Sequence, residues 1–172
     1  RADHAALIQD KLLNSNRLFT ASTIGTLRMQ KDATEQDILR INAHQADIAM
    51  RKAWDIIKPG LTEENIALAI QNSFSDQGAL PQFSIVASGS NSAFPHHQTG
   101  SRKLKEGDAI VIDLGGKFEG YASDITRMSS IGAPPKDYAL IHQIVEDAVC
   151  AAMAAARPGQ IAKNVDRAAR EV

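Results

Sequence analysis

The chain has 172 residues, and its 19 Lys and Arg nearly balance its 20 Asp and Glu. This length suffices for one domain with its own core, while the balanced charge gives no reason to expect nucleic acid as a partner. A membrane partner is also disfavoured, because no apolar run approaches the roughly 20 residues that span a bilayer. The chain opens Arg-Ala-Asp-His, without a basic and then apolar signal, and we expect a cytoplasmic protein.

The first 31 residues offer too little sequence for a domain of their own. They predict a short helix over Ala5–Leu13 and a small strand or linker over Leu18–Leu27. A longer helix is predicted from Asp32 onward, where acids follow a capping side chain and apolar residues recur at helical spacing. Either Asp32 or Thr34 can cap this helix, which ends at Pro59-Gly60.

The next elements lead from a second helix into a sheet. Thr62 is the expected N-cap of a helix that runs to about Ser75. A short apolar strand is predicted over Phe83–Ala87, and a polar loop, SGSNSAFPHHQTG, follows it over Ser88–Gly100.

Two apolar runs, separated by a Gly-rich stretch, predict a β-hairpin over Ala109–Arg127. If the turn centres between Phe118 and Glu119, Asp113 lies directly opposite Asp124. Directly paired residues share a face of the sheet, and like charges placed in this way repel each other. The hairpin therefore predicts a bound cation that offsets the repulsion.

The end of the chain repeats an earlier pattern. A long helix from about 136 to 157, then Pro158-Gly159 and a further helix, mirrors the elements around Pro59-Gly60. The repeat is offset by 98 residues at His44 and His142, and by 99 at the Pro-Gly pairs. The alternative is a chance similarity between two Ala-rich helices. If the repeat is a duplication, the second copy ends before its strands, and we expect a fragment that lacks half of the sheet.

Asp113 and Asp124 are the strongest candidates for chemistry. Carboxylate oxygens suit Mn, Co, Zn or Mg ions, and two shared carboxylates suit a pair of metals. Such a pair of metals lowers the pKa of a bridging water and polarises a carbonyl, which is hydrolytic chemistry. Two carboxylates are too few for the whole site, so further ligands must come from elsewhere. The alternative is that both acids simply cap turns.

His96 and His97 are the second candidates, in the polar loop after Pro95. A neutral imidazole can donate a hydrogen bond to a carbonyl or to a tetrahedral intermediate. Proline fixes its own φ and so stiffens the approach to the pair. The alternative is an ordinary solvated loop.

Several separate motifs resemble the creatinase/aminopeptidase P/prolidase family. The resemblance covers about residues 27–172, including the segment Leu27–Asp32 that links two domains in that family. Ser-Asp-Ile-Thr-Arg, preceded by an aspartate eleven positions before its own, is the most specific of the motifs. The motifs that carry the resemblance are Asn91–His97, Glu106–Asp108, Ile112–Gly115 and Gly120–Arg127.

The resemblance implies a pita-bread fold, an α/β (α+β) architecture with pseudo-symmetric halves around a curved, mainly antiparallel sheet. It also implies two divalent metal ions, Mn²⁺ or Co²⁺ and alternatively Zn²⁺. Asp113 matches the first aspartate ligand and Asp124 the bridging one, with Thr126 hydrogen-bonding near a ligand carboxylate. His96 matches the histidine that contacts the substrate or the intermediate, and we group His97 with it in substrate binding.

The implied activity is that of a metal-dependent Xaa-Pro aminopeptidase or dipeptidase, in which a metal-bridged hydroxide cleaves before a proline in the second position. Residues 1–31 would be the tail of an N-terminal domain plus linker, and residues 32–172 the N-terminal portion of the catalytic domain. The family's remaining ligands, one histidine and two glutamates, belong to the second half. We therefore expect this chain alone to be inactive, and the full-length protein to form a homodimer.

Three alternatives remain open at the level of sequence. A methionine aminopeptidase also carries paired aspartates on its hairpin. A pita-bread binding protein could have lost catalysis, and a creatinase-like hydrolase would need no metal. The linking segment and the Pro-His-His loop favour the prolidase side, and both retained aspartates favour an enzyme.

Overall fold

A computed structural model of the chain describes residues 7, 8, 10–14 and 24–172. The chain divides into two compact units, Arg1–Ile38 and Leu39–Val172. Part of the helix predicted over Ala5–Leu13, and most of the strand or linker predicted over Leu18–Leu27, lie outside the described residues. The prediction of a strand or linker is wrong for its last residues, which are helical. They begin α2 (Gly25–Met29), a short helix in which the Arg28 N–H donates to the carbonyl of Ile24 at 3.1 Å.

Two longer helices follow, α3 (Ala33–Ile56) and α4 (Glu63–Asp76). Asp32, and not Thr34, caps α3, because its carboxylate accepts from the Glu35 N–H at 2.9 Å while the Glu35 carboxylate accepts from the Asp32 N–H at 2.8 Å. Thr62 caps α4 through a similar reciprocal pair of bonds, as predicted.

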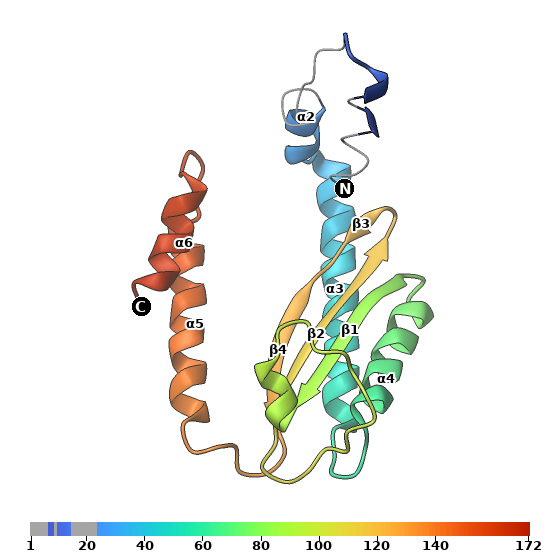
Figure 1. The fold of residues 1–172 in the computed structure, drawn as a ribbon, viewed down its shortest axis with the longest axis vertical. Helices are drawn as coiled ribbons and strands as arrows, with labels where there is room; N and C mark the ends of the chain where they lie inside the picture. The colour runs from blue at the N-terminus through green and yellow to red at the C-terminus, as the bar shows by residue number, and fades with distance from the viewer. Residues whose placement is uncertain (1–6, 9, 15–23) are drawn as a thin grey trace. The chain divides into compact units, whose positions relative to one another are not determined.

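The sheet is antiparallel, and β2 is its central strand (Figure 1). One edge of β2 pairs with β1. The other edge pairs with β4 over most of its length and with β3 at its C-terminal end. The strands are β1 (Leu80–Ser88), β2 (Ala109–Phe118), β3 (Tyr121–Ala122) and β4 (Ile125–Ser130).

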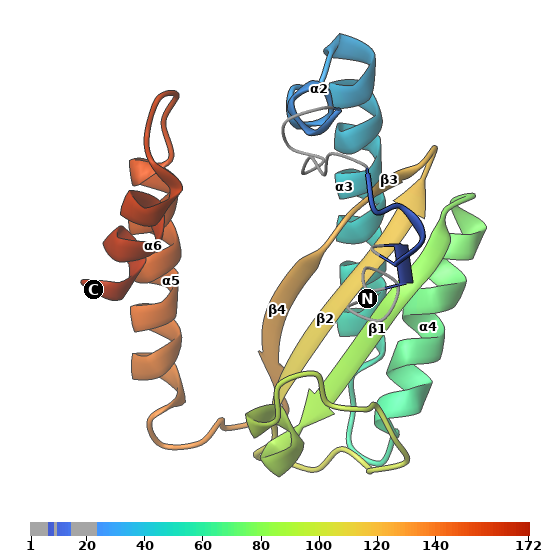
Figure 2. The ribbon, with the colours of Figure 1, turned by 45° about the horizontal axis from the view of Figure 1, so that its top comes forward.

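Helices α3 and α4 cover one face of this sheet (Figures 1 and 2). On β2, Ile110, Ile112 and Leu114 are fully buried in the core that these helices complete. Since successive side chains of a strand point to opposite faces, Asp113 lies on the face away from the helices. The core therefore positions the first candidate ligand on the open side of the sheet.

The register of the hairpin differs from the predicted one by two residues. The turn consists of Glu119 and Gly120, both with positive φ, 48° and 90°. Two-residue turns of this kind match the twist of the flanking strands. Asp113 consequently pairs with Thr126 and not with Asp124, and the predicted direct opposition of the two aspartates is wrong. A shift of two residues keeps both acids on the same face.

The last two helices, α5 (Tyr138–Ala155) and α6 (Ala162–Arg170), reproduce the spacing of α3 and α4. Helix α3 and helix α5 end 99 residues apart, at Ile56 and Ala155, and α4 and α6 begin 99 residues apart. Gly60 and Gly159 follow the two prolines with φ of 88° and 83°. The predicted repeat of helix, Pro-Gly and helix is therefore present in the structure.

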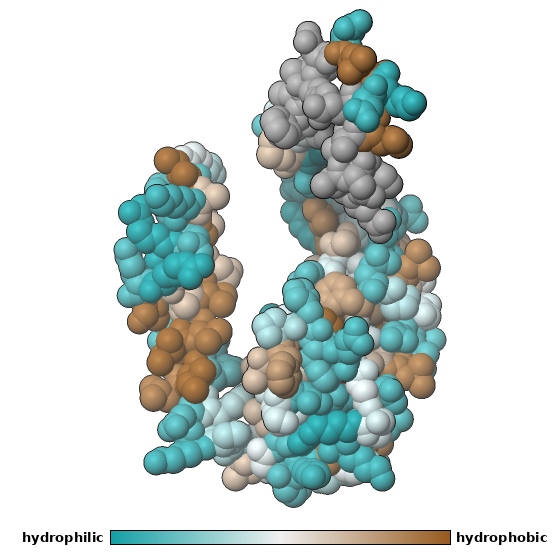
Figure 3. All heavy atoms as spheres, in the orientation of Figure 1, coloured by the Kyte–Doolittle hydropathy of each residue, from teal (hydrophilic) through white to brown (hydrophobic). Residues whose placement is uncertain are grey.

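Helix α5 differs from α3 in burial. Whereas α3 buries residues such as Ala46, Ala49 and Met50, none of the residues of α5 is buried. Apolar side chains gather along α5 (Figure 3), among them Leu140, Ile141, Ile144, Val145, Val149 and Met153. Among the residues that the structure describes, no helix has both the length and the apolar content needed to cross a bilayer.

Candidate functional site

Asp113 and Thr126 meet across the β2–β4 ladder. The Thr126 hydroxyl donates to Oδ1 of Asp113 at 2.8 Å. Thr126 is exposed and Asp113 is half-buried, so the contact lies at the surface of the open face. The bond orients the carboxylate and leaves Oδ2 of Asp113 available to a ligand. The hydrogen bond expected between Thr126 and a candidate ligand carboxylate is present, and the metal that would lie beside it stays a prediction.

Asp124 reaches the same face through a break between β3 and β4. The Ser123 N–H donates to the carbonyl of Gly116 at 2.9 Å, which continues the register and puts Asp124 across from Gly115. The backbone around Ser123 approaches β2 closely at Gly115. A Cβ on Gly115 would lie 2.5 Å from the ring of Phe83, and it would also collide with the backbone carbonyl of Ser123. A glycine between the two aspartates is therefore what allows Asp124 to approach β2.

The charge of these two carboxylates is uncompensated in the described part of the chain. No lysine, arginine or histidine there forms an ion pair with Asp113 or Asp124. Two exposed or half-buried carboxylates on one face suit a divalent cation. No group of three potential ligand side chains occurs among the described residues. The hairpin thus fits part of a metal site and supplies two of its ligands.

The two histidines lie in the loop that leaves the end of β1. This loop begins with a 3₁₀ turn over Gly89–Ala93 and continues to Pro95 and His96. His96 is exposed and has a φ of 53°, in the left-handed region that non-glycine residues rarely adopt. Such conformations are costly and concentrate at functional sites. Within the described residues, neither histidine is hydrogen-bonded to Asp113 or Asp124.

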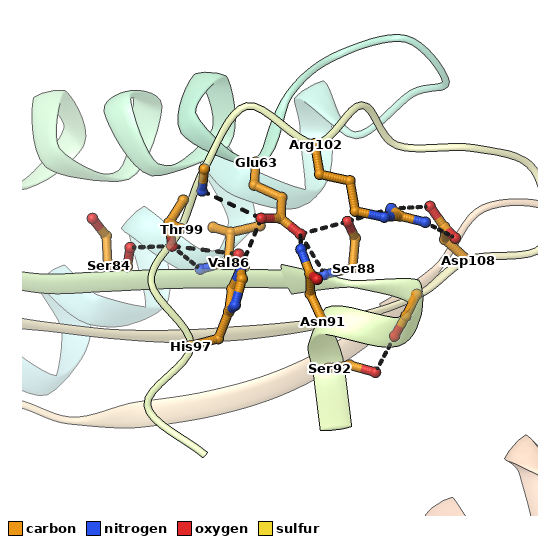
Figure 4. A network of polar contacts seen from close by, with 12 residues as sticks. Glu63, Ser84, Val86, Ser88, Asn91, Ser92, His97, Thr99, Arg102 and Asp108 are labelled. Atoms are coloured by element: carbon orange, nitrogen blue, oxygen red, sulfur yellow. Dashed lines mark hydrogen bonds and ion pairs between the residues drawn. The ribbon is translucent and has the colours of Figure 1, made fainter. Parts of the chain in front are cut away.

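His97 is held in place by a buried carboxylate (Figure 4). Its Nε2 lies 2.9 Å from Oε2 of Glu63, whose side chain is 0% exposed against 15% for His97. The other oxygen of Glu63 accepts from the Ser88 N–H at 2.8 Å, the Ser88 hydroxyl at 2.7 Å and the Asn91 amide at 3.0 Å. The Gly100 N–H completes the set at 3.3 Å from Oε2.

The environment of Glu63 favours its ionised form. Burial by itself would raise the pKa of Glu63, but the hydrogen bonds from Ser88, His97 and Asn91 bring it below its usual value of 4.5. Glu63 is also the first residue of α4, where the helix dipole favours a negative charge. At neutral pH it is therefore a carboxylate that only accepts hydrogen bonds.

A second ion pair supports the same loop. Arg102 donates two bonds to Asp108, from Nη1 at 2.6 Å and from Nη2 at 2.8 Å, and a further bond to the Ser88 hydroxyl at 2.6 Å. The hydrogen bond from Arg102 lowers the pKa of Asp108 below its usual value of 3.8, although burial opposes the shift. The Ser88 hydroxyl thereby links the Glu63 carboxylate to Arg102, and Arg102 in turn pairs with Asp108.

The lowered pKa values predict a loss of stability in acid. A carboxyl group whose folded-state pKa lies below its unfolded value stabilises the fold above that value and loses its contribution as the pH falls. We expect the free energy of unfolding of the 172-residue chain to decrease below about pH 4.5, and less steeply in Asp108→Asn. Urea denaturation between about pH 6 and pH 3 measures this slope.

Asp166→Asn is the matched control for this experiment. Asp166 also pairs with an arginine, Arg170, at 2.9 Å, but both side chains are exposed, so the solvent screens the pair. The free energy of unfolding of Asp166→Asn should therefore depend on pH in the same way as that of the wild type. If Asp108→Asn keeps the full acid slope, the Asp108–Arg102 pair is not a source of pH-dependent stability.

The structure therefore groups the predicted residues into two sets. Asp113, Thr126 and Asp124 share the open face of the hairpin, while His96 and His97 lie on the loop. Glu63 was missed as a functional residue. The sequence shows it only as one of two acids in the first turn of a helix, and nothing local distinguishes the buried acid from its exposed neighbour.

A family model described as metallopeptidase family M24 matches residues 37–172. The chain is 41% identical over 148 residues to a Mycobacterium tuberculosis protein named probable dipeptidase PepE, covering 85% of this chain and 40% of that protein. It is 37% identical over 151 residues to the Xaa-Pro dipeptidase of Pyrococcus furiosus, covering 87% of this chain and 43% of that protein.

Solved structures give the same result. The dipeptidase PepE of Mycobacterium ulcerans matches with a TM-score of 0.91 and 37% identity, covering 99% of this chain and 46% of that one. The prolidase of Pyrococcus furiosus matches with a TM-score of 0.84 and 37% identity, covering 87% of this chain and 45% of that one. The chain thus spans less than half the length of these relatives.

Proposed function

The chain belongs to metallopeptidase family M24, and from this premise we propose that its full-length gene product is a Xaa-Pro peptidase. It would hydrolyse the bond between an N-terminal residue and a following proline. Relatives named Xaa-Pro dipeptidase and prolidase support this substrate class. The observation in the molecule that carries the proposal is the hairpin, where Asp113, its partner Thr126 and Asp124 share the open face of the sheet.

Each residue has a distinct part in this proposal. Asp113 and Asp124 would hold divalent ions, Mn²⁺ or Co²⁺ and alternatively Zn²⁺, which when bound would polarise the scissile carbonyl and acidify a water. Thr126 keeps one oxygen of Asp113 oriented. His96 would donate a hydrogen bond to the substrate from a neutral imidazole. Because Nε2 of His97 is bonded to Glu63, His97 can offer a substrate only its Nδ1.

The test is a specificity assay on the purified full-length gene product with Mn²⁺ or Co²⁺. We expect turnover of an Xaa-Pro dipeptide, or of a tripeptide with proline second, and much slower turnover of Met-Ala-Ser. A preference for Met-Ala-Ser would assign the methionine aminopeptidase activity. Binding of the proline peptides without turnover would identify a binding protein that has lost catalysis.

The 172-residue chain by itself should bind metal weakly and hydrolyse no Xaa-Pro dipeptide. Its described residues offer two neighbouring carboxylates and no group of three ligands, whereas catalytic zinc sites, for example, use three protein ligands. Isothermal titration with Mn²⁺ and a peptidase assay on the same preparation measure both properties. Turnover by this chain would show that the described acids suffice, and it would overturn the expectation that ligands are missing.

A further inference from the structure

Glu63 contacts the histidine loop at points on both sides of His96. Ser88 and Asn91 precede His96 in the chain, and His97 and Gly100 follow it, and all four donate to the same buried carboxylate. We propose that Glu63 is a positioning residue, which holds His96 in its active conformation through these four anchors. The inference rests on the proposed function, in which His96 contacts the substrate.

The loop has further attachments to β1. The Thr99 hydroxyl accepts from the Val86 N–H at 2.8 Å and lies 3.3 Å from the carbonyls of Val86 and Ser84. These contacts attach the end of the loop to the edge of β1 (Figure 4), whose other edge pairs with β2. One strand therefore separates the anchored end of the loop from Ile112 and Asp113, and the loop is built onto the same sheet as the aspartates.

His96 itself has no such support. It is exposed, and no hydrogen bond holds its side chain within the described residues, yet its φ of 53° is unfavourable for a residue with a side chain. An unfavourable backbone conformation persists only where its surroundings impose it. Here the anchors on either side, at Asn91 and His97, impose it, and Glu63 is what the two anchors share.

The chemistry of Glu63 also determines the tautomer of His97. Oε1 accepts three bonds and Oε2 accepts two, so every neighbour of the carboxylate is a donor. Nε2 of His97 must then carry a proton. Glutamine at position 63 would keep the size of the side chain, but its N–H groups would face the donors that now bond to one of the two oxygens. Glu63→Gln therefore removes the negative charge and one of the two acceptor oxygens without creating a cavity.

The kinetic test compares Glu63→Gln with Glu64→Gln in the full-length gene product. Glu64 is the next residue of the same helix turn, carries the same charge and is exposed, so it is a matched control. We expect kcat to fall about 100-fold in Glu63→Gln with KM changed by less than about threefold, because a small misplacement of His96 affects the reaction more than binding. Glu64→Gln should stay within about twofold of wild type.

Two further variants separate positioning from general stability. The losses of kcat in Glu63→Gln and in His97→Asn should not add up in the double variant, because both changes break the same anchor. Asn91→Ala removes one donor to Glu63 and should lower kcat roughly tenfold. This variant tests the same anchor independently, in case Glu63→Gln does not fold. If kcat is unchanged in Asn91→Ala and in any folded Glu63→Gln, Glu63 has no positioning role.

A spectroscopic measurement on the 172-residue chain does not depend on activity. The Nε2 proton of His97 should give a slowly exchanging imidazole resonance in wild type and Glu64→Gln, and this resonance should exchange faster with water or disappear in Glu63→Gln. The backbone of His96 should become mobile by ¹⁵N relaxation in the same variant. A full-length product that hydrolyses no peptide, with these signals intact, would refute the proposed function alone. Equal order of the loop in wild type and Glu63→Gln would refute the positioning role.

Discussion

Asp124→Ala should reduce the peptidase activity of the full-length gene product about 1,000-fold or more and leave its fold intact. Asp124 is exposed and forms no ion pair in the described part of the chain, so the fold does not depend on its charge. Its proposed part is to hold metal together with Asp113, and losing a ligand removes the ion that polarises the substrate. Steady-state kinetics with added Mn²⁺ and a thermal unfolding curve measure the two effects separately.

Glu119→Gln is the matched control for this variant. Glu119 lies in the turn of the same hairpin, is exposed and loses the same charge, but it is not part of the aspartate pair. Its activity should remain near wild type. If Asp124→Ala unfolds the protein, the acid is structural, and if the variant keeps its activity, the hairpin acids are not metal ligands.

Gly115→Ala should destabilise the 172-residue chain by about 1–3 kcal/mol and impair the site as well. The added methyl group would meet the ring of Phe83 at 2.5 Å and the backbone carbonyl of Ser123. A ring can turn away, but the carbonyl belongs to the segment that carries Asp124 to β2. Relieving the collision therefore displaces Asp124 from its register. Urea denaturation gives the change in stability, and metal titration of the full-length product gives the effect on the site.

Gly100→Ala provides the comparison within the same fold. The nearest atom to a Cβ at Gly100 is a backbone oxygen 3.8 Å away, and the φ of this residue is not positive. Its stability should change by less than about 0.5 kcal/mol, and its N–H can still donate to Glu63. Equal effects of the two substitutions would show that the close approach at Gly115 does not constrain the hairpin.

Much of the fold could be predicted because its signals are local. Thr62 caps α4 through side-chain and backbone groups three residues apart. Each Pro-Gly pair ends a helix region, at Gly60 and at Gly159, where the glycine adopts positive φ. The motifs of the loop and the hairpin identified the family, and the comparisons confirm both the family and the half of a pita-bread architecture that it implies.

The hairpin register could not be derived in the same way. Centring the turn on Phe118 and Glu119 is as consistent with the alternating apolar pattern as the observed register, because a shift of two residues preserves which residues share a face. What selected the observed register was the backbone of the turn, where Glu119 and Gly120 both take positive φ. The prediction that Asp113 and Asp124 share a face was therefore correct, and the direct partner of Asp113 was wrongly identified.

By itself, the sequence predicted which residues take part in the chemistry of this protein: the aspartates of the hairpin, the histidines of the loop and the threonine beside Asp113. Residue types and short spacings are enough for that, because helix caps, turns and motifs depend on neighbours in the chain. Only the tertiary structure showed that Glu63 is the buried acid and Glu64 the exposed one. The donors that stabilise the Glu63 carboxylate lie 25 to 37 residues away, and only packing brings them around it.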